Sequence, residues 1–295
     1  MLFRKAAIIG VGLLGGSLGL ALRQRRLSAS VHGYVRREAS LAECRGAGAV
    51  DEVSTDLAAV VTDADLVVLC TPVGQMGALL VGARPALKPG AIVTDVGSVK
   101  GPVVAEAEPL CLKAAARFIG SHPMAGSEQH GVTAAQAGLF EGAVCAVTPT
   151  TRSDPAALVQ VEALWRALGT HVLRLAPEAH DVLVAHASHL PQAIAASLAG
   201  LVLDPASPPE QAQLCAGGFR DSTRIAAGSP EMWRDIFVAN RRPVTQAIDA
   251  FVSRLRTLRK AIRAGDAGAI NAFLQTARER RDAWMRSRHA HRPGA

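Results

Sequence analysis

Three glycines near the start of the chain, Gly10, Gly12 and Gly15, most constrain what this sequence can fold into. They follow the apolar run KAAIIGVG and precede GSLGLALRQRR, which has the composition of a helix. A G-x-G-x-x-G pattern between a strand and a helix is typical of a dinucleotide-binding turn, because the glycines permit a tight turn and close approach of a pyrophosphate. The amides of Leu13 and Leu14 at the helix start then bind the anion. The alternative is a tight turn without a ligand.

Six apolar, β-rich runs recur along the first half of the chain, with helical stretches between them. Their hydrophobicity is continuous rather than alternating, which is typical of strands buried on both faces. Strands that alternate with helices form a parallel sheet with right-handed crossovers. The sequence therefore predicts a doubly wound α/β fold of the Rossmann type, with strands in KAAIIGVG (5–12), ASVHGYV (29–35), DLVVLCTP (65–72), AIVTDVGS (91–98), RFIGSHP (117–123) and AVCAVTPT (143–150).

From about Pro177 the character of the sequence changes. The stretch EAHDVLVAHASHLPQAIAASLAGLVL is rich in Ala and Leu, and the later apolar segments also have helical spacing. We therefore predict a dinucleotide-binding domain over 1–175 and an all-helical substrate and dimerisation domain over 176–295. The long apolar helices expose more hydrophobic surface than a monomer is expected to hide, which favours a homodimer.

Composition excludes several classes of protein. The 295 residues are 49% hydrophobic and 19% charged, as expected of a globular protein with a large core. No uninterrupted apolar run reaches the roughly 18 residues of a membrane helix, and the N-terminus lacks a signal-peptide pattern. Five scattered cysteines without a C-x-x-C pair indicate neither a disulfide framework nor a zinc site. We expect a cytoplasmic protein that does not bind a membrane.

The formal net charge of +7 arises in large part near the end of the chain, in ARERRDAWMRSRHAHR. The chain has one Tyr, and its Phe residues are dispersed, so no aromatic stacking platform accompanies the basic residues. We interpret the segment as a solvated basic helix end and expect no nucleic-acid partner. The positive balance also attracts anionic substrates and cofactors.

The end of the second predicted strand bears on cofactor choice. An NAD-binding protein normally has an acidic residue there to accept hydrogen bonds from the ribose 2′-hydroxyl. This chain has Val35 instead, followed by Arg36 and Arg37. Two guanidinium groups suit a 2′-phosphate, so the sequence favours NADP over NAD. The nearby Glu38 and the possibility that both arginines are only solvated leave NAD open.

Polar turns follow three of the predicted strands, in CTPVGQ, DVGSVK and GSHPMAGSE. In an open parallel sheet, ligands lie beyond the carboxyl ends of the strands. These turns are therefore expected to place Thr71 with Pro72, Ser98, Lys100 and His122 around a nicotinamide ring. His122 is then the residue that faces the reacting carbon.

Five segments together resemble the prephenate and arogenate dehydrogenases of tyrosine biosynthesis: GVGLLGGSLGLAL, TDVGSVK, GSHPMAGSEQHGV, SHLPQAIA and GGFRDSTRIAAGSPEMWRDIF. The resemblance runs from about residue 5 to about residue 275. It implies a Rossmann domain followed by a helical dimerisation domain, and the oxidative decarboxylation of a cyclohexadienyl substrate with hydride transfer to NAD(P).

The resemblance also implies roles for individual residues. His122 matches the histidine that hydrogen-bonds the 4-hydroxyl of the substrate, and Ser98 matches a serine that supports this contact. His189 matches a second histidine of the substrate pocket, Arg224 an arginine that binds a carboxylate, and Trp233 a tryptophan that lines the pocket. The side-chain chemistry is consistent with two of these roles. The neutral imidazole of His122 can accept the hydroxyl proton as hydride leaves, and the guanidinium of Arg224 can hold a carboxylate through a fixed fork of donors.

Each of these assignments has an alternative. Arg224 is also placed to pair with Asp221 or Asp235, and an isolated Trp233 is most simply a core residue. His186 and His189 lie three residues apart on a helix, but no third ligand at a convincing spacing supports a metal site.

Two questions of function stay open at this stage. The substrate is prephenate or arogenate, and Gln192, an uncharged neighbour of the expected pocket, does not choose between their side chains. The alternative functions are another two-domain dehydrogenase of the β-hydroxyacid or imine-reductase kind, and a nucleotide sensor without catalysis. Tyrosine inhibition, if present, is expected at the active site.

Overall fold

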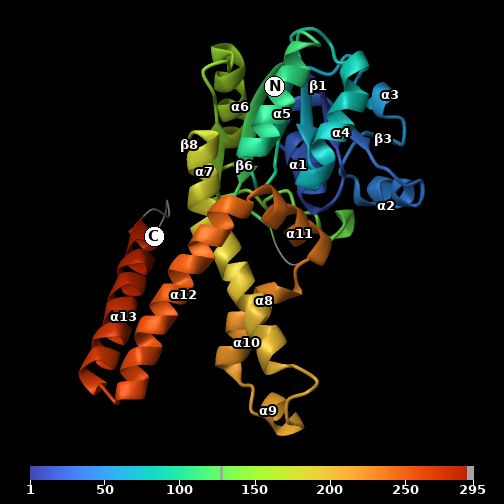
Figure 1. Ribbon diagram of the computed structural model, residues 1–295. Helices are drawn as coiled ribbons and strands as arrows, with labels where there is room; N and C mark the ends of the chain where they lie inside the picture. The colour runs from blue at the N-terminus through green and yellow to red at the C-terminus, as the bar shows by residue number, and fades with distance from the viewer. Residues whose placement is uncertain (127–128, 291–295) are drawn as a thin grey trace. The chain divides into compact units, whose positions relative to one another are not determined.

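The computed structural model describes residues 1–126 and 129–290 (Figure 1). A first compact unit covers Met1–Arg241, and a second begins at Arg242. The first unit thus contains the whole sheet and the helices that follow it up to residue 241. The predicted division of the chain at residues 175 and 176 stays a prediction.

An eight-stranded sheet forms the centre of the first unit, in the order β3-β2-β1-β4-β5-β6-β7-β8. The strands from β3 to β6 in this order are parallel, which confirms the predicted Rossmann-type fold. The strands are β1 Phe3–Ile9, β2 Ser28–Tyr34, β3 Glu52–Ser54, β4 Leu66–Leu69, β5 Ile92–Asp95, β6 Arg117–Pro123, β7 Val144–Thr148 and β8 His171–Arg174.

One edge of the sheet departs from the prediction. Strand β7 pairs antiparallel with β6, and β8 then pairs parallel with β7. A parallel pair needs a long crossover, usually a helix. The described residues between β6 and β7 contain only a 3-10 turn at Val132–Ala134, so the chain returns antiparallel. The expectation of a wholly parallel sheet was wrong here.

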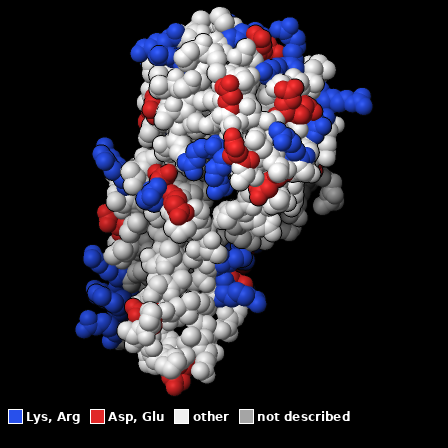
Figure 2. Space-filling model, turned by 90° about the vertical axis from the view of Figure 1, so that its right-hand side faces the viewer, with Lys and Arg blue, Asp and Glu red and all other residues white. Residues whose placement is uncertain are grey.

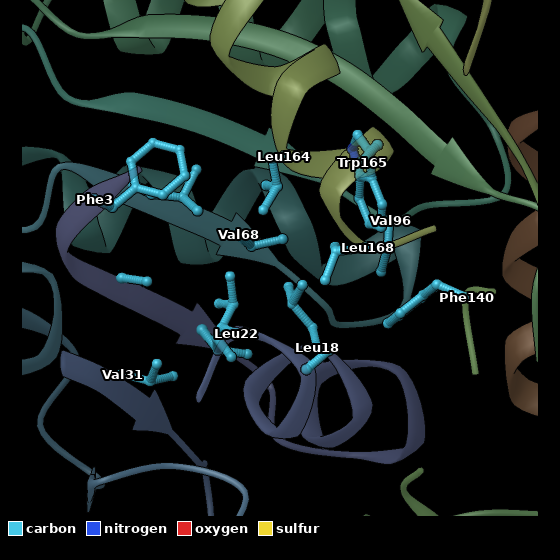
Figure 3. Close-up of a cluster of buried hydrophobic side chains, with 14 of the residues drawn as sticks. Phe3, Leu18, Leu22, Val31, Val68, Val96, Phe140, Leu164, Trp165 and Leu168 are labelled. Carbon is cyan, nitrogen blue, oxygen red and sulfur yellow. The ribbon is translucent and has the colours of Figure 1, made fainter. Parts of the chain in front are cut away.

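Alternate residues of the central strands face two separate hydrophobic cores. In β1, Ile8 lies in one core and Ile9 in the other, and in β4, Val68 and Leu69 are divided in the same way. All four side chains are fully buried. Figure 3 shows the first of these cores, where Leu18 and Leu22 of one helix and Leu164 and Trp165 of another lie against the sheet. Burial on both faces explains why these strands have continuous apolar sequences.

Among the described residues, six α-helices connect the strands, and their ends follow local sequence signals. Asp154 accepts a hydrogen bond from the amide of Ala157 and Pro155 occupies the first turn, so α6 begins there. The six helices are α1 Leu13–Gln24, α2 Ala39–Ala47, α3 Leu57–Val61, α4 Val73–Ala83, α5 Gly101–Leu112 and α6 Pro155–Ala167.

The described residues after β8 are helical, as predicted. The first unit ends with α7 Pro177–Val184, a π-helix Ala185–His189, α8 Leu190–Val202, α9 Pro209–Gln213, α10 Gly217–Thr223, a 3-10 turn Arg224–Ala227 and α11 Pro230–Ala239. Two long helices follow, α12 Arg241–Ala264 and α13 Ala267–Ala290.

One continuous helical stretch, Pro177–Val202, is long and apolar enough to cross a membrane by length and composition alone. Core helices of soluble proteins pass the same test, and this stretch contains the buried polar residues His180, Asp181, His189 and Gln192. Charged side chains of both signs are scattered over the face of the molecule shown in Figure 2, with broad uncharged areas between them.

Candidate active site

The glycine turn lies between β1 and α1, as the sequence predicts. Gly10 has a φ of +100°, and a Cβ there would lie 2.7 Å from the side chain of Thr71. A Cβ on Gly15 would lie 2.0 Å from the carbonyl oxygen of Gly10. These two positions therefore require glycine for the fold itself.

Gly12 differs from its two neighbours in the motif. It is the N-cap of α1 in an extended conformation, without a side-chain cap, and a Cβ on it would meet nothing within 4 Å. The amides of Leu13 and Leu14 belong to the first helical turn, whose N–H groups have no partner within the helix. Open space beside uncapped amides fits an anion such as a pyrophosphate.

The difference between Gly12 and Gly15 predicts that alanine at Gly15 lowers stability, whereas alanine at Gly12 weakens nucleotide binding. Gly15→Ala is expected to lower the free energy of unfolding by about 1–3 kcal/mol, because the new methyl group overlaps the main chain of Gly10. Gly12→Ala is expected to leave stability nearly unchanged and to weaken nucleotide binding at least about 10-fold, because its methyl group occupies the space beside the amides. Urea unfolding and nucleotide titration of both variants check this. Equal nucleotide affinity in wild type and Gly12→Ala would contradict it.

The candidates for recognition of the ribose follow β2. Val35 is buried and belongs to the first core, so its side chain does not face a ligand. Arg36, Arg37 and Glu38 are exposed. The charged groups next to the expected ribose are therefore two guanidinium groups and one carboxylate.

Two further predicted cofactor residues follow β4. Thr71 lies against Gly10, and its hydroxyl oxygen is buried without a hydrogen-bond partner. Pro72 is the N-cap of α4. An unpartnered buried hydroxyl beside the glycine turn fits a polar group of a ligand.

His122 lies in β6 and is 93% buried, with 7% of its surface exposed. Its Nδ1 is 2.9 Å from Nε2 of His180, and Nδ1 of His180 is 2.8 Å from Oδ1 of Asp181. Asp181 also accepts hydrogen bonds from the amides of Lys100 and Gly101, at 2.7 and 2.8 Å. These amides stand at the start of α5, where a negative charge is stabilised. His122 is thus linked through His180 to a fixed carboxylate.

Burial keeps His122 neutral. Desolvation lowers its pKa well below the usual value, and the nearby His180, Lys100 and His189 lower it further. A neutral imidazole at the end of a strand is suited to accept a proton at neutral pH.

Lys100 does not face the expected nicotinamide position. It is fully buried, and its ammonium binds Oδ2 of Asp95 and, at 2.8 Å, the carbonyl oxygen of Ser121. Asp95 in turn accepts hydrogen bonds from the amides of Gly97 and Ser121. The expectation that Lys100 lines the cofactor site was wrong, because this ion pair holds the lysine beneath the strand that carries His122.

His189 and Trp233 lie together, with ring centroids 6.0 Å apart in an edge-to-face arrangement. His189 is fully buried, its Nδ1 is 3.1 Å from Nδ2 of Asn240, and its Nε2 has no hydrogen-bond partner. Gln192 lies on the same helical stretch, and its Oε1 is also buried without a partner. Two unsatisfied polar atoms this close in the chain fit a polar ligand.

Desolvation lowers the pKa of His189 to about 4, against opposing effects that include Asp181. The unfolded chain takes up this proton near pH 6.5 and the folded chain only near pH 4, so the stabilisation is complete above pH 6.5 and is lost as the pH falls toward 4. A span of about 2.5 pH units corresponds to about 3 kcal/mol. We expect His189→Gln to lose about that much less stability than wild type between pH 7 and 4, measured by urea unfolding. Parallel losses in both proteins would contradict this.

Ser98 and Arg224 are the two remaining predicted site residues. Ser98 follows β5 and is partly buried, and a main-chain contact with Ser98 favours the protonated imidazole of His189 and so raises its pKa. Ser98 therefore lies beside His189. Arg224 begins the 3-10 turn Arg224–Ala227 and is exposed. Their roles stay predictions.

Asp221 and Asp235 are the two carboxylates that the sequence offered as ion-pair partners of Arg224, and each forms an ion pair with the arginine next to it in the chain. Asp221 pairs with Arg220, and Asp235 pairs with Arg234. Asp235 also lies against Gly74, in the first turn of α4, where the helix dipole favours a carboxylate.

The described residues contain no group of three or more His, Cys, Asp or Glu side chains that fits a metal ion. His186 is exposed whereas His189 is buried, so the two do not form a pair. His180, Asp181 and Asn240 were not predicted as site residues. The dipeptide His-Asp at the start of the apolar helical stretch is a signal for the first two, and no sequence pattern marks Asn240.

A glycine turn after β1 of a Rossmann-type sheet and a neutral buried histidine on β6 of the same sheet define a nicotinamide-dependent oxidoreductase as the class of protein. Comparison with known proteins makes the class specific. Residues 18–174 match the prephenate dehydrogenase nucleotide-binding domain, and residues 176–276 match the prephenate dehydrogenase dimerization domain. The chain therefore belongs to the prephenate dehydrogenase family, which confirms the resemblance seen in the sequence.

Similar proteins include enzymes with different substrate names. The cyclohexadienyl dehydrogenase of Zymomonas mobilis is 34% identical over 90% of each chain. The structure of Aquifex aeolicus prephenate dehydrogenase in complex with hydroxyphenyl propionate and NAD+ has a TM-score of 0.89, 33% identity, and coverage of 95% of this chain and 98% of that one. Synechocystis arogenate dehydrogenase has a TM-score of 0.80, 31% identity, and coverage of 95% and 99%.

Proposed function

We propose that the protein catalyses the oxidative decarboxylation of a cyclohexadienyl substrate, prephenate or arogenate, in tyrosine biosynthesis. The observation that carries the proposal is the neutral, buried His122 linked to Asp181 through His180. Such an imidazole accepts the proton of the 4-hydroxyl group while the carbon that bears it loses hydride. The nicotinamide, when bound, accepts that hydride.

The loss of carbon dioxide and the aromatisation of the ring need little from the protein. As the carbinol carbon loses hydride, the bond between the ring and its carboxylate breaks and the carboxylate leaves as carbon dioxide. The electron pair of that bond passes through the ring to the oxygen, which takes the proton back from His122, so the ring becomes an aromatic phenol. The protein contributes orientation of the substrate against the cofactor and removal of one proton at Nε2 of His122. Ser98 supports this contact, as the family resemblance implies.

The rest of the substrate is assigned to residues of the helical region. His189 and Gln192 present unpartnered buried polar atoms, and Trp233 lies beside His189. These residues form the proposed pocket for the ring and its substituents. Arg224 is proposed to bind a substrate carboxylate, for which a guanidinium is well suited.

NADP is the proposed cofactor, with NAD as the alternative. Gly10, Gly12 and Gly15, with the amides of Leu13 and Leu14, are proposed to hold the pyrophosphate, and Thr71 and Pro72 to lie along the nicotinamide side. Arg36 and Arg37 take the 2′-phosphate. The choice of NADP is supported by Val35, which stands where an NAD-binding protein normally has an acidic residue, and by the exposure of both guanidinium groups.

The cofactor proposal predicts the effect of one double variant. Arg36→Ser with Arg37→Ser is expected to raise the KM for NADP about 10- to 100-fold, because charge-assisted hydrogen bonds to a phosphate contribute about 1.5–3 kcal/mol. The KM for NAD is expected to change less than about 3-fold. Steady-state kinetics with both nucleotides check this, with the exposed pair Arg278 and Arg280 replaced by serine as a control. Equal changes for both nucleotides would contradict it.

The assembly is proposed to be a cytoplasmic homodimer without nucleic-acid or membrane partners. The match to a dimerization domain supports the dimer. Large apolar side chains are also exposed on the helical region, with Leu201 72% and Leu214 84% exposed. The described basic residues near the C-terminus lie on α13 with the 53% exposed Trp284, and a single indole is not the series of aromatic side chains on which single-stranded nucleic acid stacks.

The deciding experiment measures formation of reduced nicotinamide by the purified protein with prephenate or arogenate, each paired with NAD or NADP. Turnover in one or more pairs supports the proposed reaction and shows which substrate and cofactor are used. Folded protein that binds nucleotide but turns over no pair would overturn it, in favour of another two-domain dehydrogenase or a nucleotide sensor.

A further inference from the structure

Asp181 occupies a central place among the buried polar groups of the site. Its carboxylate contacts His180, which contacts His122. Its main-chain carbonyl oxygen is 2.9 Å from Nδ2 of Asn240, and the same Nδ2 contacts His189. One residue thus reaches two histidines of the site by two separate routes.

The carboxylate route determines which nitrogen of His122 carries the proton. Both oxygens of Asp181 accept main-chain N–H groups, so the carboxylate is an acceptor and Nδ1 of His180 must donate to it. A neutral His180 then has an unprotonated Nε2, which can only accept. His122 must therefore donate from Nδ1, and its Nε2 is left as a proton acceptor.

The carbonyl route gives His189 the opposite arrangement. A carbonyl oxygen only accepts, so the Asn240 atom that lies 2.9 Å from it is the NH2 group. The second hydrogen of that group is donated to Nδ1 of His189, which must be unprotonated. The proton of a neutral His189 is then on Nε2, the buried atom that has no hydrogen-bond partner.

We propose that Asp181, through His180 and Asn240, holds His122 and His189 in opposite tautomers, so that the site contains one imidazole acceptor and one imidazole donor. His180 and Asn240 are positioning residues in this arrangement. The catalytic meaning rests on the proposed function: Nε2 of His122 takes the hydroxyl proton, and the N–H at Nε2 of His189 binds a carboxylate or keto oxygen of the substrate. An ammonium group, which has only donors, does not fit that atom.

Nitrogen-15 NMR of the imidazole rings tests the proposal directly, at about pH 8, above the usual range of histidine pKa values. The signals are assigned with His122→Gln and His189→Gln. The expected result is one proton on Nδ1 of His122 and one on Nε2 of His189. The reverse tautomer at either residue, a mixture, or a doubly protonated His180 would overturn the proposal.

Two variants test the routes one at a time. Asn240→Asp replaces the donor by an acceptor, so the proton of His189 is expected to move to Nδ1 while His122 keeps its tautomer. His180→Phe keeps the shape of the ring without its nitrogens, so His122 is expected to become a mixture while His189 is unchanged. The exposed His186→Gln is the matched control and should change neither ring. Unchanged tautomers in both variants would overturn the proposal.

Kinetics add a measurement that a merely structural role would not change in the same way. His180→Phe is expected to lower kcat by at least about 10-fold, and by less than the roughly 10⁴-fold loss that a wrong tautomer causes in a serine-protease triad, with little change in KM. Asn240→Asp is expected to raise KM for the substrate. Tautomers as predicted in a protein without turnover would refute the proposed function and leave the proposed tautomers standing.

Discussion

Replacing His122 by glutamine is expected to lower kcat by about 10²- to 10⁴-fold, the usual contribution of a general base. Glutamine has a similar length and is uncharged, as the buried imidazole is, but its amide cannot take up a proton. The nucleotide turn lies on β1 and α1, whereas His122 lies on β6, so nucleotide affinity is expected to stay within about 2-fold of wild type. Steady-state kinetics and nucleotide titration check both statements.

His171→Gln is the matched control, because His171 is an exposed histidine of the same sheet. It should leave kcat unchanged. The pH profile gives a second check, because burial and nearby positive groups lower the pKa of His122 well below its usual value. The acidic limb of kcat/KM in wild type is therefore expected below pH 6.5 and should be absent in His122→Gln. A variant with nearly full kcat would show that another group removes the proton.

Much of the fold was predictable because buried strands require apolar residues, which are visible in the sequence. Strands buried on both faces must be apolar at every position, so Ile8 and Ile9, or Val68 and Leu69, mark β1 and β4 without any alternation. The turn at Gly10 was predictable for a similar reason, since its φ of +100° is open to few other residues. The direction of β7 was not, because it depends on the length and content of a connection rather than on the strand.

The contacts of the candidate site were harder to predict than its residues. His180 and His189 are nine residues apart, which in a regular α-helix places them on opposite faces. The π-helix Ala185–His189 changes the helical phase, and His189 contacts Asn240, whose side-chain amide also binds the main-chain carbonyl of Asp181. Single π-turns are frequent at functional sites, but no simple sequence pattern marks them.

Lys100 is a second residue whose position was predictable from the sequence but whose contacts were not. Its position after β5 predicted a residue at the edge of the sheet, and the position is correct. The direction of its side chain depends on Asp95, five residues earlier, and on the carbonyl oxygen of Ser121 in the next strand. A partner on another strand is invisible to local sequence patterns.

The buried pair of Lys100 and Asp95 is expected to be the most sensitive point of the fold. Both side chains are fully buried, so Lys100→Met leaves the Asp95 carboxylate without its counter-charge in the interior. Removal of one partner of a buried ion pair costs about 3–5 kcal/mol. We expect a loss of that size in the free energy of unfolding, measured with urea at pH 7. Lys88→Met, which removes a part-exposed partner of Asp65, should cost about 1 kcal/mol or less.

A second substitution distinguishes loss of charge balance from loss of packing. In Lys100→Met with Asp95→Asn the uncompensated charge is gone, and the amide oxygen still accepts one of the main-chain hydrogen bonds from Gly97 and Ser121. The double variant is therefore expected to recover more than half of the lost stability. No recovery would mean that the lysine stabilises the fold through its packed methylene groups and its bond to the Ser121 carbonyl. In either case the lost stability arises next to His122, because Lys100 binds the carbonyl oxygen of Ser121, the residue before His122 in β6.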